Sequence, residues 1–384
     1  MFDPIKASKE IKDSYIDYIT TTFDMADTDY EREFRKELQT DGMVASGPFL
    51  DIGGSYETGH TLRELIQAQK ASILFENLEP VAEKERELKL DRPLYQHQET
   101  AMLKADKGEN LVVTTGTGSG KTESFLLPII NHLLREQEAG TLYAGVRAII
   151  IYPMNALAND QMKRMRALFK NYPQICYGVY NGNTEHTQSK ALAEYHRTYH
   201  DEAGEPIDPA PNEIISREVM QERPPHILIT NYSMLEYMML RPKDDAVFSG
   251  AKLKFIVLDE AHIYKGATGM ETSLLMRRLR ARISEPDSVQ YILTSATLGG
   301  PDADGDILSF AEKLCGVAFQ RSGIIRSTEK RPAMEDFLDF TPALFEELQR
   351  SPDISSVLAR YHADFAPGAV SYTHLRAHET VLDL

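Results

Sequence analysis

The chain carries Thr114-Thr115-Gly116-Thr117-Gly118-Ser119-Gly120-Lys121-Thr122, and this stretch decides its fold. An apolar run that is typical of a buried strand, Leu111–Thr115, leads into it, and a helical pattern over residues 121–136 follows it. Closely spaced glycines allow the backbone between a strand and a helix to curl, so that successive amide groups face one point. The stretch therefore predicts an anion-binding loop at the edge of an α/β sheet.

Short apolar strands and helices alternate along the rest of this region. Strands are predicted at Leu111–Thr115, Val146–Tyr152, Ile175–Tyr180, His226–Thr230, Leu253–Asp259 and Gln290–Thr294. Helices are predicted at residues 121–136, 154–170, 232–240, 270–283 and 306–315. Strands that are buried on both faces and separated by helices form parallel sheets. The pattern predicts an α/β lobe with a mostly parallel sheet, interrupted by a polar, proline-containing insertion at residues 181–225.

The regions on either side have a different character. Residues 1–90 predict a mainly helical, acidic accessory region, and residues 91–320 hold the α/β lobe. Residues 321–369 are interpreted as a connector toward a second lobe that this chain lacks. Val370–Thr380 resembles the conceptual translation of a transposase adapter used in preparing DNA sequencing libraries, so we expect residues 370–384 to be an artefact and the natural protein to be longer.

Composition limits the classes of protein to which the chain can belong. The net charge of −16 argues against binding of nucleic acid through an overall positive field, although it allows a local basic surface. No apolar run approaches the roughly 18–20 residues that a membrane-spanning helix needs, and no secretory signal is visible. The only two cysteines, Cys176 and Cys315, are far apart in the sequence, which fits a reducing cytoplasm.

The glycine-rich loop has the chemistry of an ATP site. Its amides and the N-terminus of the next helix would face the phosphates, Lys121 would reach the β- and γ-phosphates, and the Thr122 hydroxyl would ligate Mg²⁺. Thr115 stands where the usual loop has Gly or Ala. The residues expected to line the ATP phosphates are Thr115, Gly116, Thr117, Gly118, Ser119, Gly120, Lys121 and Thr122.

A second acidic segment would complete that site. Asp259-Glu260-Ala261-His262 follows the apolar run Phe255–Leu258, at the strand end where open parallel sheets bind ligands. Asp259 would hold Mg²⁺ mainly through water, and Glu260 would orient the attacking water. His262 would pass the state of the γ-phosphate to neighbouring segments. Gln98, near Tyr95 and 23 residues before Lys121, has an amide donor and acceptor that could bind the adenine edge.

These segments resemble a known family. In order, Leu94–Gln98, Thr115–Thr122, Ile149–Gln161, Thr230–Tyr237, Asp259–His262 and Ser295–Thr297 are similar to motifs of superfamily 2 DEAD/DEAH-box helicases. The segment from Ile263 to Leu279 is most similar to the large bacterial Lhr- and MrfA-type helicases. The resemblance covers about residues 90–320 and implies a RecA-like lobe.

The resemblance also implies contacts with nucleic acid. Pro153, Asn155 and Asn231 would touch the backbone of one strand, which positions the strand without reading its sequence. Alternatively, the two asparagines only cap the helices that follow them. Ser295 and Thr297 would couple ATP hydrolysis to unwinding.

Three functions remain open on the sequence. The resemblance favours the ATP-binding part of a 3′-to-5′ DNA helicase or translocase, with ATP and Mg²⁺ as cofactors. An RNA-dependent ATPase and a nucleotide-binding regulatory module of a larger complex, for example in phage defence, are the alternatives. Since no arginine-bearing second lobe is present, we expect this chain alone to bind ATP weakly and to hydrolyse it poorly.

Overall fold

The computed structural model describes residues 4–23, 27–40, 42–45, 56–78, 88–116, 118–201, 204–249, 251–296, 301–328 and 330. They belong to two compact units, one of residues 56–330 and one of residues 1–55 and 331–384. The described part of the latter unit holds two helices that pack together, α1 (Pro4–Thr22) and α2 (Thr28–Gln39). The predictions for residues 331–369 and 370–384 lie outside the described residues.

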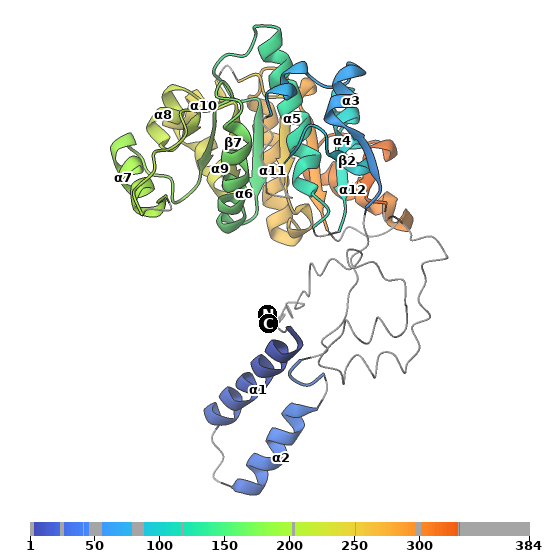
Figure 1. Cartoon of the computed structure of the whole chain (residues 1–384), viewed down its shortest axis with the longest axis vertical. Helices are drawn as coiled ribbons and strands as arrows, with labels where there is room; N and C mark the ends of the chain where they lie inside the picture. The colour runs from blue at the N-terminus through green and yellow to red at the C-terminus, as the bar shows by residue number, and fades with distance from the viewer. Residues whose placement is uncertain are drawn as a thin grey trace. The chain divides into compact units, whose positions relative to one another are not determined.

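An eight-stranded parallel sheet forms the centre of the larger unit (Figure 1). Its strand order is β10-β3-β9-β8-β4-β7-β5-β6, and every neighbouring pair is parallel. The strands are β3 (Leu111–Thr114), β4 (Ala148–Tyr152), β5 (Tyr177–Tyr180), β6 (Glu213–Ile214), β7 (Ile227–Asn231), β8 (Phe255–Leu258), β9 (Gln290–Ser295) and β10 (Ile324–Arg326). The predicted parallel α/β sheet is confirmed, and the short edge strands β6 and β10 are additions to it.

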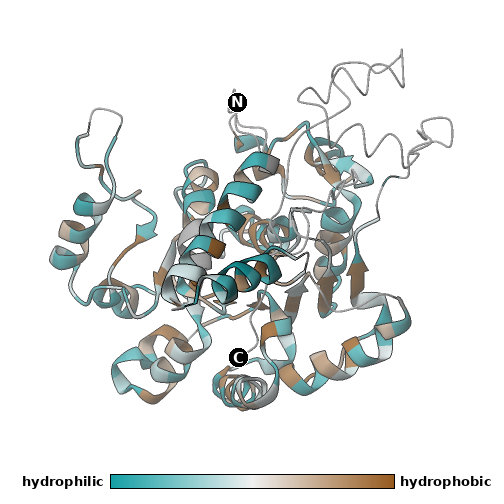
Figure 2. Cartoon of the chain, turned by 90° about the horizontal axis from the view of Figure 1, so that it is seen from below, coloured by the Kyte–Doolittle hydropathy of each residue, from teal (hydrophilic) through white to brown (hydrophobic). Residues whose placement is uncertain are grey.

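Helices cover both faces of this sheet. One face packs against α3 (Leu62–Gln67), α4 (Gln96–Asp106), α5 (Lys121–Glu138) and α6 (Asn155–Phe169). The other packs against α8 (Arg217–Glu222), α9 (Tyr232–Leu240), α10 (Asp245–Phe248), α11 (Gly266–Arg282) and α12 (Asp304–Cys315). Figure 2 shows hydrophobic strands lying between helices of mixed hydropathy, as a sheet that is buried on both faces requires.

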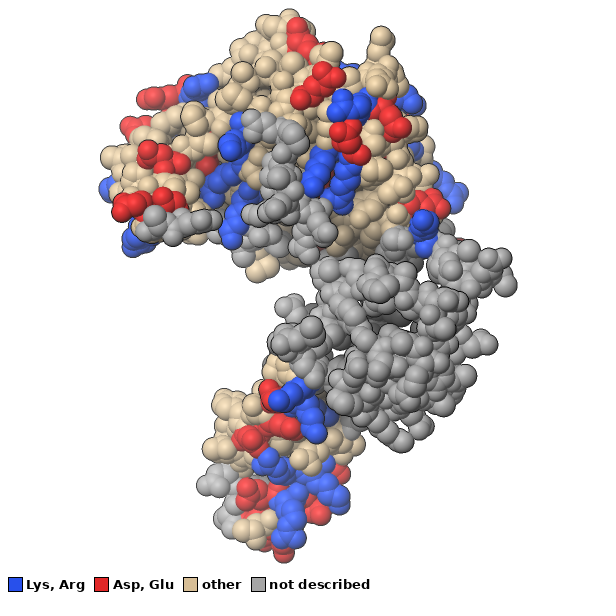
Figure 3. Space-filling view, viewed as in Figure 1, with Lys and Arg blue, Asp and Glu red and all other residues tan. Residues whose placement is uncertain are grey.

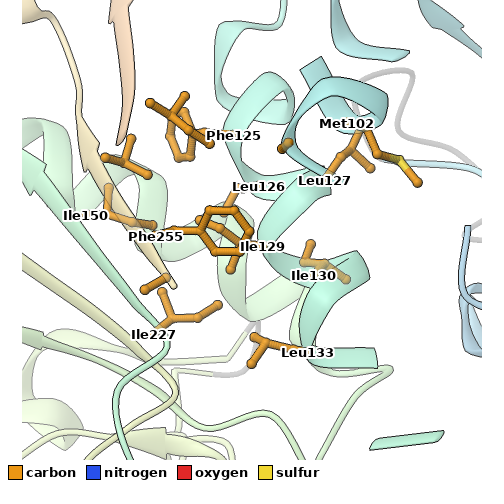
Figure 4. Packing of buried hydrophobic residues seen from close by; sticks show 14 of the residues in the cluster. Met102, Phe125, Leu126, Leu127, Ile129, Ile130, Leu133, Ile150, Ile227 and Phe255 are labelled. Carbon is orange, nitrogen blue, oxygen red and sulfur yellow. The ribbon is translucent and has the colours of Figure 1, made fainter. Parts of the chain in front are cut away.

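Packing of α5 against the sheet holds the glycine-rich loop in place. Phe125, Ile129 and Leu133 of α5 are fully buried and lie against sheet residues that include Ile150 and Phe255 (Figure 4). Burial of each such side chain contributes about 1.5–3 kcal/mol to stability. The start of α5, at Lys121, is therefore fixed relative to the carboxyl ends of the strands.

Residues before the lobe also join it. The strand β1 (Thr58–Thr61) pairs antiparallel with β2 (Pro93–Tyr95), which directly precedes α4. Thr61 caps α3 in a capping box with Glu64, whose carboxylate accepts from the Thr61 amide at 2.7 Å. The insertion contributes β6, α7 (Gln188–Thr198) and α8. The 3₁₀ helices are Ile73–Asn77, Pro242–Asp244, Ala261–Ile263, Pro286–Ser288, Pro301–Ala303 and Arg321–Gly323.

Every helix in the described ranges is too short or too polar to cross a membrane. Basic and acidic side chains are interleaved over the visible face of the larger unit (Figure 3). The arginines of α11, which form the densest basic cluster in the sequence, follow this arrangement. Arg278 pairs with Glu236 at 2.5 Å, Arg280 pairs with Asp287 at 2.6 Å and Arg282 pairs with Asp245, so three of these charges are partly neutralised locally.

Candidate nucleotide-binding site

The glycine-rich loop connects β3 to α5 at the carboxyl edge of the sheet. Gly118 and Gly120 have φ values of +82° and +73°, a backbone region that favours glycine. A Cβ at Gly120 would also lie 2.4 Å from Nε2 of Gln98, so a larger residue would clash there. Within the loop, the buried Ser119 hydroxyl donates to Oγ1 of Thr115 at 2.7 Å. Thr117 lies outside the described residues.

Lys121 begins α5 and contacts the acidic turn after β8. Its Nζ lies 3.1 Å from Oε1 of Glu260, and the Lys121 side chain is only 10% exposed. An ion pair this sheltered from water is stronger than one on the surface. The pair joins the two segments of the proposed ATP site, and a phosphate bound in the loop would compete with Glu260 for Lys121.

Asp259 follows β8 and faces the neighbouring strand β9. Thr294 of β9 donates its hydroxyl hydrogen to Oδ1 of Asp259. Burial raises the pKa of Asp259, while the Thr294 hydrogen bond and the charge of Lys121 lower it. The next residue, Glu260, has a left-handed backbone with φ of +48°, which is unusual for a residue other than glycine. This turn aims the Glu260 carboxylate back toward Lys121.

The residues at this edge fit a magnesium ion. Mg²⁺ prefers hard oxygen ligands, keeps several of its waters, and is commonly held by one or two carboxylates together with substrate phosphates. Asp259 supplies a half-buried carboxylate and Thr122, 9% exposed at the start of α5, supplies a hydroxyl. In the described ranges no group of three or more His, Cys, Asp or Glu residues forms a dedicated metal cage. A magnesium ion here would be held by these two residues, water and phosphate together.

His262 links the acidic turn to the end of β9. Its Nδ1 lies 3.1 Å from the Ser295 hydroxyl and 3.3 Å from Oε2 of Glu260. Burial lowers the pKa of His262, whereas the Glu260 carboxylate raises it. The arrangement can relay a change at Glu260 to Ser295. Thr297 lies outside the described residues.

Gln98 and His97 support the loop from α4. The Gln98 amide donates to the Gly120 carbonyl at 3.0 Å, and its carbonyl oxygen accepts from the Tyr95 amide at 3.0 Å. The Gln98 side-chain NH₂ group can donate one further hydrogen bond, and its carbonyl oxygen can accept one further hydrogen bond. His97 contacts the Ser119 carbonyl through Nε2 at 2.9 Å, and its ring stacks on Tyr95. The adenine-binding role of Gln98 stays a prediction.

The segments expected to contact nucleic acid lie side by side at the carboxyl ends of the paired strands β4 and β7. Nδ2 of Asn231 donates to Oδ1 of Asn155 at 2.7 Å, and Oδ1 of Asn231 accepts from the Met234 amide at 2.7 Å. Asn231 therefore caps α9, the alternative that the sequence left open. Asn155 is the first residue of α6, and Pro153, half-buried, precedes it.

Sequence analysis missed two residues that support the site, Thr294 and His97. Thr294 is the partner of Asp259 because β8 and β9 pair with Leu258 opposite Leu293. The signal available in the sequence was its position directly before Ser295. His97 carried no signal beyond its place next to Gln98.

Comparison with known proteins agrees with this arrangement. The family model described as DEAD/DEAH box helicase matches residues 95–203 and 204–304. Druantia protein DruE of Escherichia coli is 32% identical over 413 aligned residues, covering 84% of this chain and 22% of that protein. ATP-dependent helicase Lhr-Core of Methanothermobacter thermautotrophicus is 27% identical over 189 residues, covering 49% of this chain and 20% of that protein. The expected similarity to Lhr-type helicases is confirmed, and the chain spans about a fifth of the length of these relatives.

A solved structure shares the fold. DEAD-box helicase Mss116, solved bound to ssRNA and UDP-BeF, aligns with a TM-score of 0.52 and 17% identity, covering 72% of this chain and 47% of that one. The likeness confirms the RecA-like architecture expected for the lobe. With the family model matching more than half of its residues, this chain belongs to the DEAD/DEAH box helicase family.

Proposed function

We propose that this chain is the ATP-binding lobe of an ATP-dependent helicase or translocase that acts on DNA in the 3′-to-5′ direction. One observation carries the proposal: a series of three contacts connects the glycine-rich loop to the acidic turn after β8, and that turn to the end of β9. They are Lys121 to Glu260, Thr294 to Asp259, and His262 to Ser295. A nucleotide bound in the loop would therefore act on residues of both β8 and β9.

Each residue has a distinct task in this proposal. Lys121 leaves Glu260 and neutralises the β- and γ-phosphates, and the amides at the start of α5 bind the same oxygens. Asp259 and Thr122 hold Mg²⁺, which supplies charge stabilisation to the transferring phosphoryl group when bound. Glu260, released from Lys121, orients the attacking water. His262 and Ser295, with Thr297, carry the change toward the strand-binding surface.

We propose a domain organisation in which the catalytic arginines come from a second lobe. Residues 91–320 form the ATP-binding lobe, residues 1–90 an accessory region, and residues 321–369 a connector to a second lobe. Arginines from such a second lobe are worth about 10³–10⁵ in rate in related nucleotide hydrolases. This chain alone should therefore hydrolyse ATP poorly. Its cysteines are free and buried, which supports our placing it in the reducing cytoplasm.

Pro153, Asn155 and Asn231 are the proposed contacts to nucleic acid. They lie at adjacent strand ends, and the hydrogen bond between the two asparagines holds them together. The preference for DNA comes from the resemblance to Lhr- and MrfA-type helicases. RNA is the second candidate, because Mss116, which shares the fold, was solved bound to ssRNA.

The test combines binding with stimulation of hydrolysis. We expect a fluorescent ATP analogue with Mg²⁺ to bind the unmodified chain, and Lys121→Ala to weaken it about 10- to 100-fold through loss of a charged hydrogen bond worth about 1.5–3 kcal/mol. Lys107→Ala, at an exposed lysine that ends α4, is the matched control and should bind normally. Single-stranded DNA and RNA of equal length are then compared as stimulators of hydrolysis by the full-length source protein.

Three results would change the conclusion. Stronger stimulation by RNA would replace the DNA assignment with the RNA-dependent ATPase. Nucleotide binding without stimulation by either polymer would support the regulatory module. Rapid polynucleotide-stimulated turnover by the 384-residue chain alone would refute the need for a second lobe.

A further inference from the structure

A partly buried polar cluster lies beside the glycine-rich loop, on the face of the sheet that α5 and α6 cover. Its members are Glu123 in the first turn of α5, Arg164 of α6 and Tyr152 at the end of β4. Arg164 donates from Nη2 to Oε1 of Glu123. The site described above gives none of these three residues a task.

Glu123 is the member of the cluster that lies next to the glycine-rich loop. A Cβ built on Gly120 would lie 3.0 Å from Oε2 of Glu123, so this oxygen sits directly beside the loop backbone. The same oxygen is buried and has no hydrogen-bond partner in the part of the chain that the structure describes. Leaving a buried acceptor unsatisfied costs about 1–3 kcal/mol. The carboxylate is therefore better explained by a task than by its contribution to stability.

Tyr152 is the member of the cluster that interacts electrostatically with Asp259 of the acidic turn. Its side chain is 1% exposed, and its hydroxyl has no hydrogen-bond partner among the described residues. Burial raises the pKa of Tyr152, the Asp259 carboxylate raises it further, and Arg164 lowers it. The charges of Asp259 and Arg164 therefore act on this hydroxyl in opposite directions. The chain then continues from Tyr152 through Pro153 to the start of α6.

Arg164 is the member of the cluster that shares a helix with a proposed nucleic-acid contact. It lies on α6, whose first residue is Asn155, and a continuous helix moves as one element. Glu123 lies two residues after Lys121, so it moves with the loop. The ion pair between Glu123 and Arg164 is thus a direct link between the element that holds phosphate and the element that carries Asn155.

We propose that the Glu123–Arg164 ion pair couples nucleotide binding in the loop to the placement of α6 for nucleic acid. Arg164 is a positioning residue, since it would touch neither ligand. The unpartnered Oε2 of Glu123 can accept a further hydrogen bond, so the pair has a second arrangement available when nucleotide binds. Coupling between sites requires an element with two such arrangements. This inference rests on the proposed function of the lobe.

The test measures coupling rather than activity. The affinity of the 384-residue chain for a fluorescent ATP analogue is determined with and without saturating single-stranded DNA. We expect DNA to tighten nucleotide binding about fivefold or more, within the usual range of roughly 5- to 150-fold for coupled sites. Arg164→Met should reduce this factor to less than twofold and leave nucleotide affinity without DNA nearly unchanged. Glu123→Gln should do the same, and the double variant should lose no more, because the two residues act as one pair.

The control uses a second ion pair on the same helix. Arg166 of α6 pairs with Glu213 of β6 at 2.7 Å, with side chains 22% and 2% exposed, and contacts the insertion instead of α5. Arg166→Met removes a more deeply buried pair than Glu123–Arg164, whose side chains are 19% and 39% exposed, and should nevertheless keep the wild-type coupling factor. An equal loss in both variants would mean that any disturbance of α6 has this effect, and would overturn the inference.

The remaining outcomes are also decisive. A folded Arg164→Met variant with the wild-type coupling factor would overturn the inference while leaving the proposed function intact. If Arg164→Met does not fold, it is replaced by Arg164→Lys, which keeps the charge on a shorter side chain. Arg164→Lys should show an intermediate coupling factor, and a wild-type factor would again overturn the inference. An unmodified chain that binds neither ATP analogue nor DNA would refute the proposed function itself, and this inference with it.

Discussion

Replacing Gly120 by alanine should damage both the stability of the lobe and its binding of nucleotide. At φ of +73° an L-residue costs roughly 1–2 kcal/mol. The new Cβ would also lie 2.4 Å from Nε2 of Gln98, so the Gln98 amide must move and give up its hydrogen bond to the Gly120 carbonyl, at a cost of about 0.5–1.5 kcal/mol. Together these effects predict a loss of about 1.5–3.5 kcal/mol in the free energy of unfolding.

Gly140→Ala separates the two contributions. Gly140 follows the other end of α5, has φ of +67°, and has open space where a Cβ would lie. It should lose only the backbone cost, about 1–2 kcal/mol. Urea unfolding of the two variants measures the difference, and titration with a fluorescent ATP analogue should show at least tenfold weaker binding for Gly120→Ala alone.

The double variant Gly120→Ala, Gln98→Ala provides the internal check. Removing the Gln98 amide relieves the clash, so the second substitution should cost less in the Gly120→Ala background than in the wild-type chain. Equal losses for Gly120→Ala and Gly140→Ala, together with normal nucleotide binding by both, would refute the reasoning. The close approach of Gln98 to the loop would then have no energetic consequence.

Three further predictions address other parts of the lobe. Burial lowers the pKa of His132 and His226 to about 4, so as the pH falls the unfolded chain binds these protons before the folded chain does. The free energy of unfolding should therefore fall by up to about 2 kcal/mol per histidine between pH 7.5 and 5. Urea unfolding that is unchanged over this range would contradict this prediction. Asn231→Ser should keep the cap of α9, whereas Asn231→Ala should lose about 1 kcal/mol in the free energy of unfolding. If both variants bind DNA equally weakly, the loss of binding comes from the missing contact between Asn231 and the DNA strand. Glu260→Gly should relieve the left-handed backbone but also remove the carboxylate that pairs with Lys121. Because these two effects oppose each other, the free energy of unfolding should stay within about 1 kcal/mol of wild type, while ATP hydrolysis by the full-length source protein is lost.

The sheet was predictable because its central strands are apolar on both faces and are separated by helices of ordinary length. The edge strands were not. Glu213 of β6 is buried against partners from other elements, Arg166 and Tyr195, and a strand of two residues has no periodicity to detect. β10 has three residues and is recognisable only by its pairing with β3.

The candidate site was partly predictable for a related reason. Lys121, Asp259 and Glu260 directly follow strands or glycines in the sequence, so local pattern locates them. The contact of Thr294 with Asp259 depends on the register between β8 and β9, which only the tertiary pairing sets. The cap that Asn231 forms follows from local sequence, whereas its bond to Asn155 joins residues 76 positions apart.

The position of β3 in the sheet has a consequence for synthesis of the protein. Both neighbours of β3, the strands β9 and β10, come from residues 290 and later, whereas β3 itself ends at Thr114. At roughly 5–20 residues per second, the ribosome needs about 10–35 s to make the chain between them. During that time β4 can pair with β7 and β8, but β3 has neither partner. The strand that leads into the phosphate loop is therefore among the last to enter the sheet, and a nascent chain should acquire nucleotide binding only after residue 326 has left the ribosome.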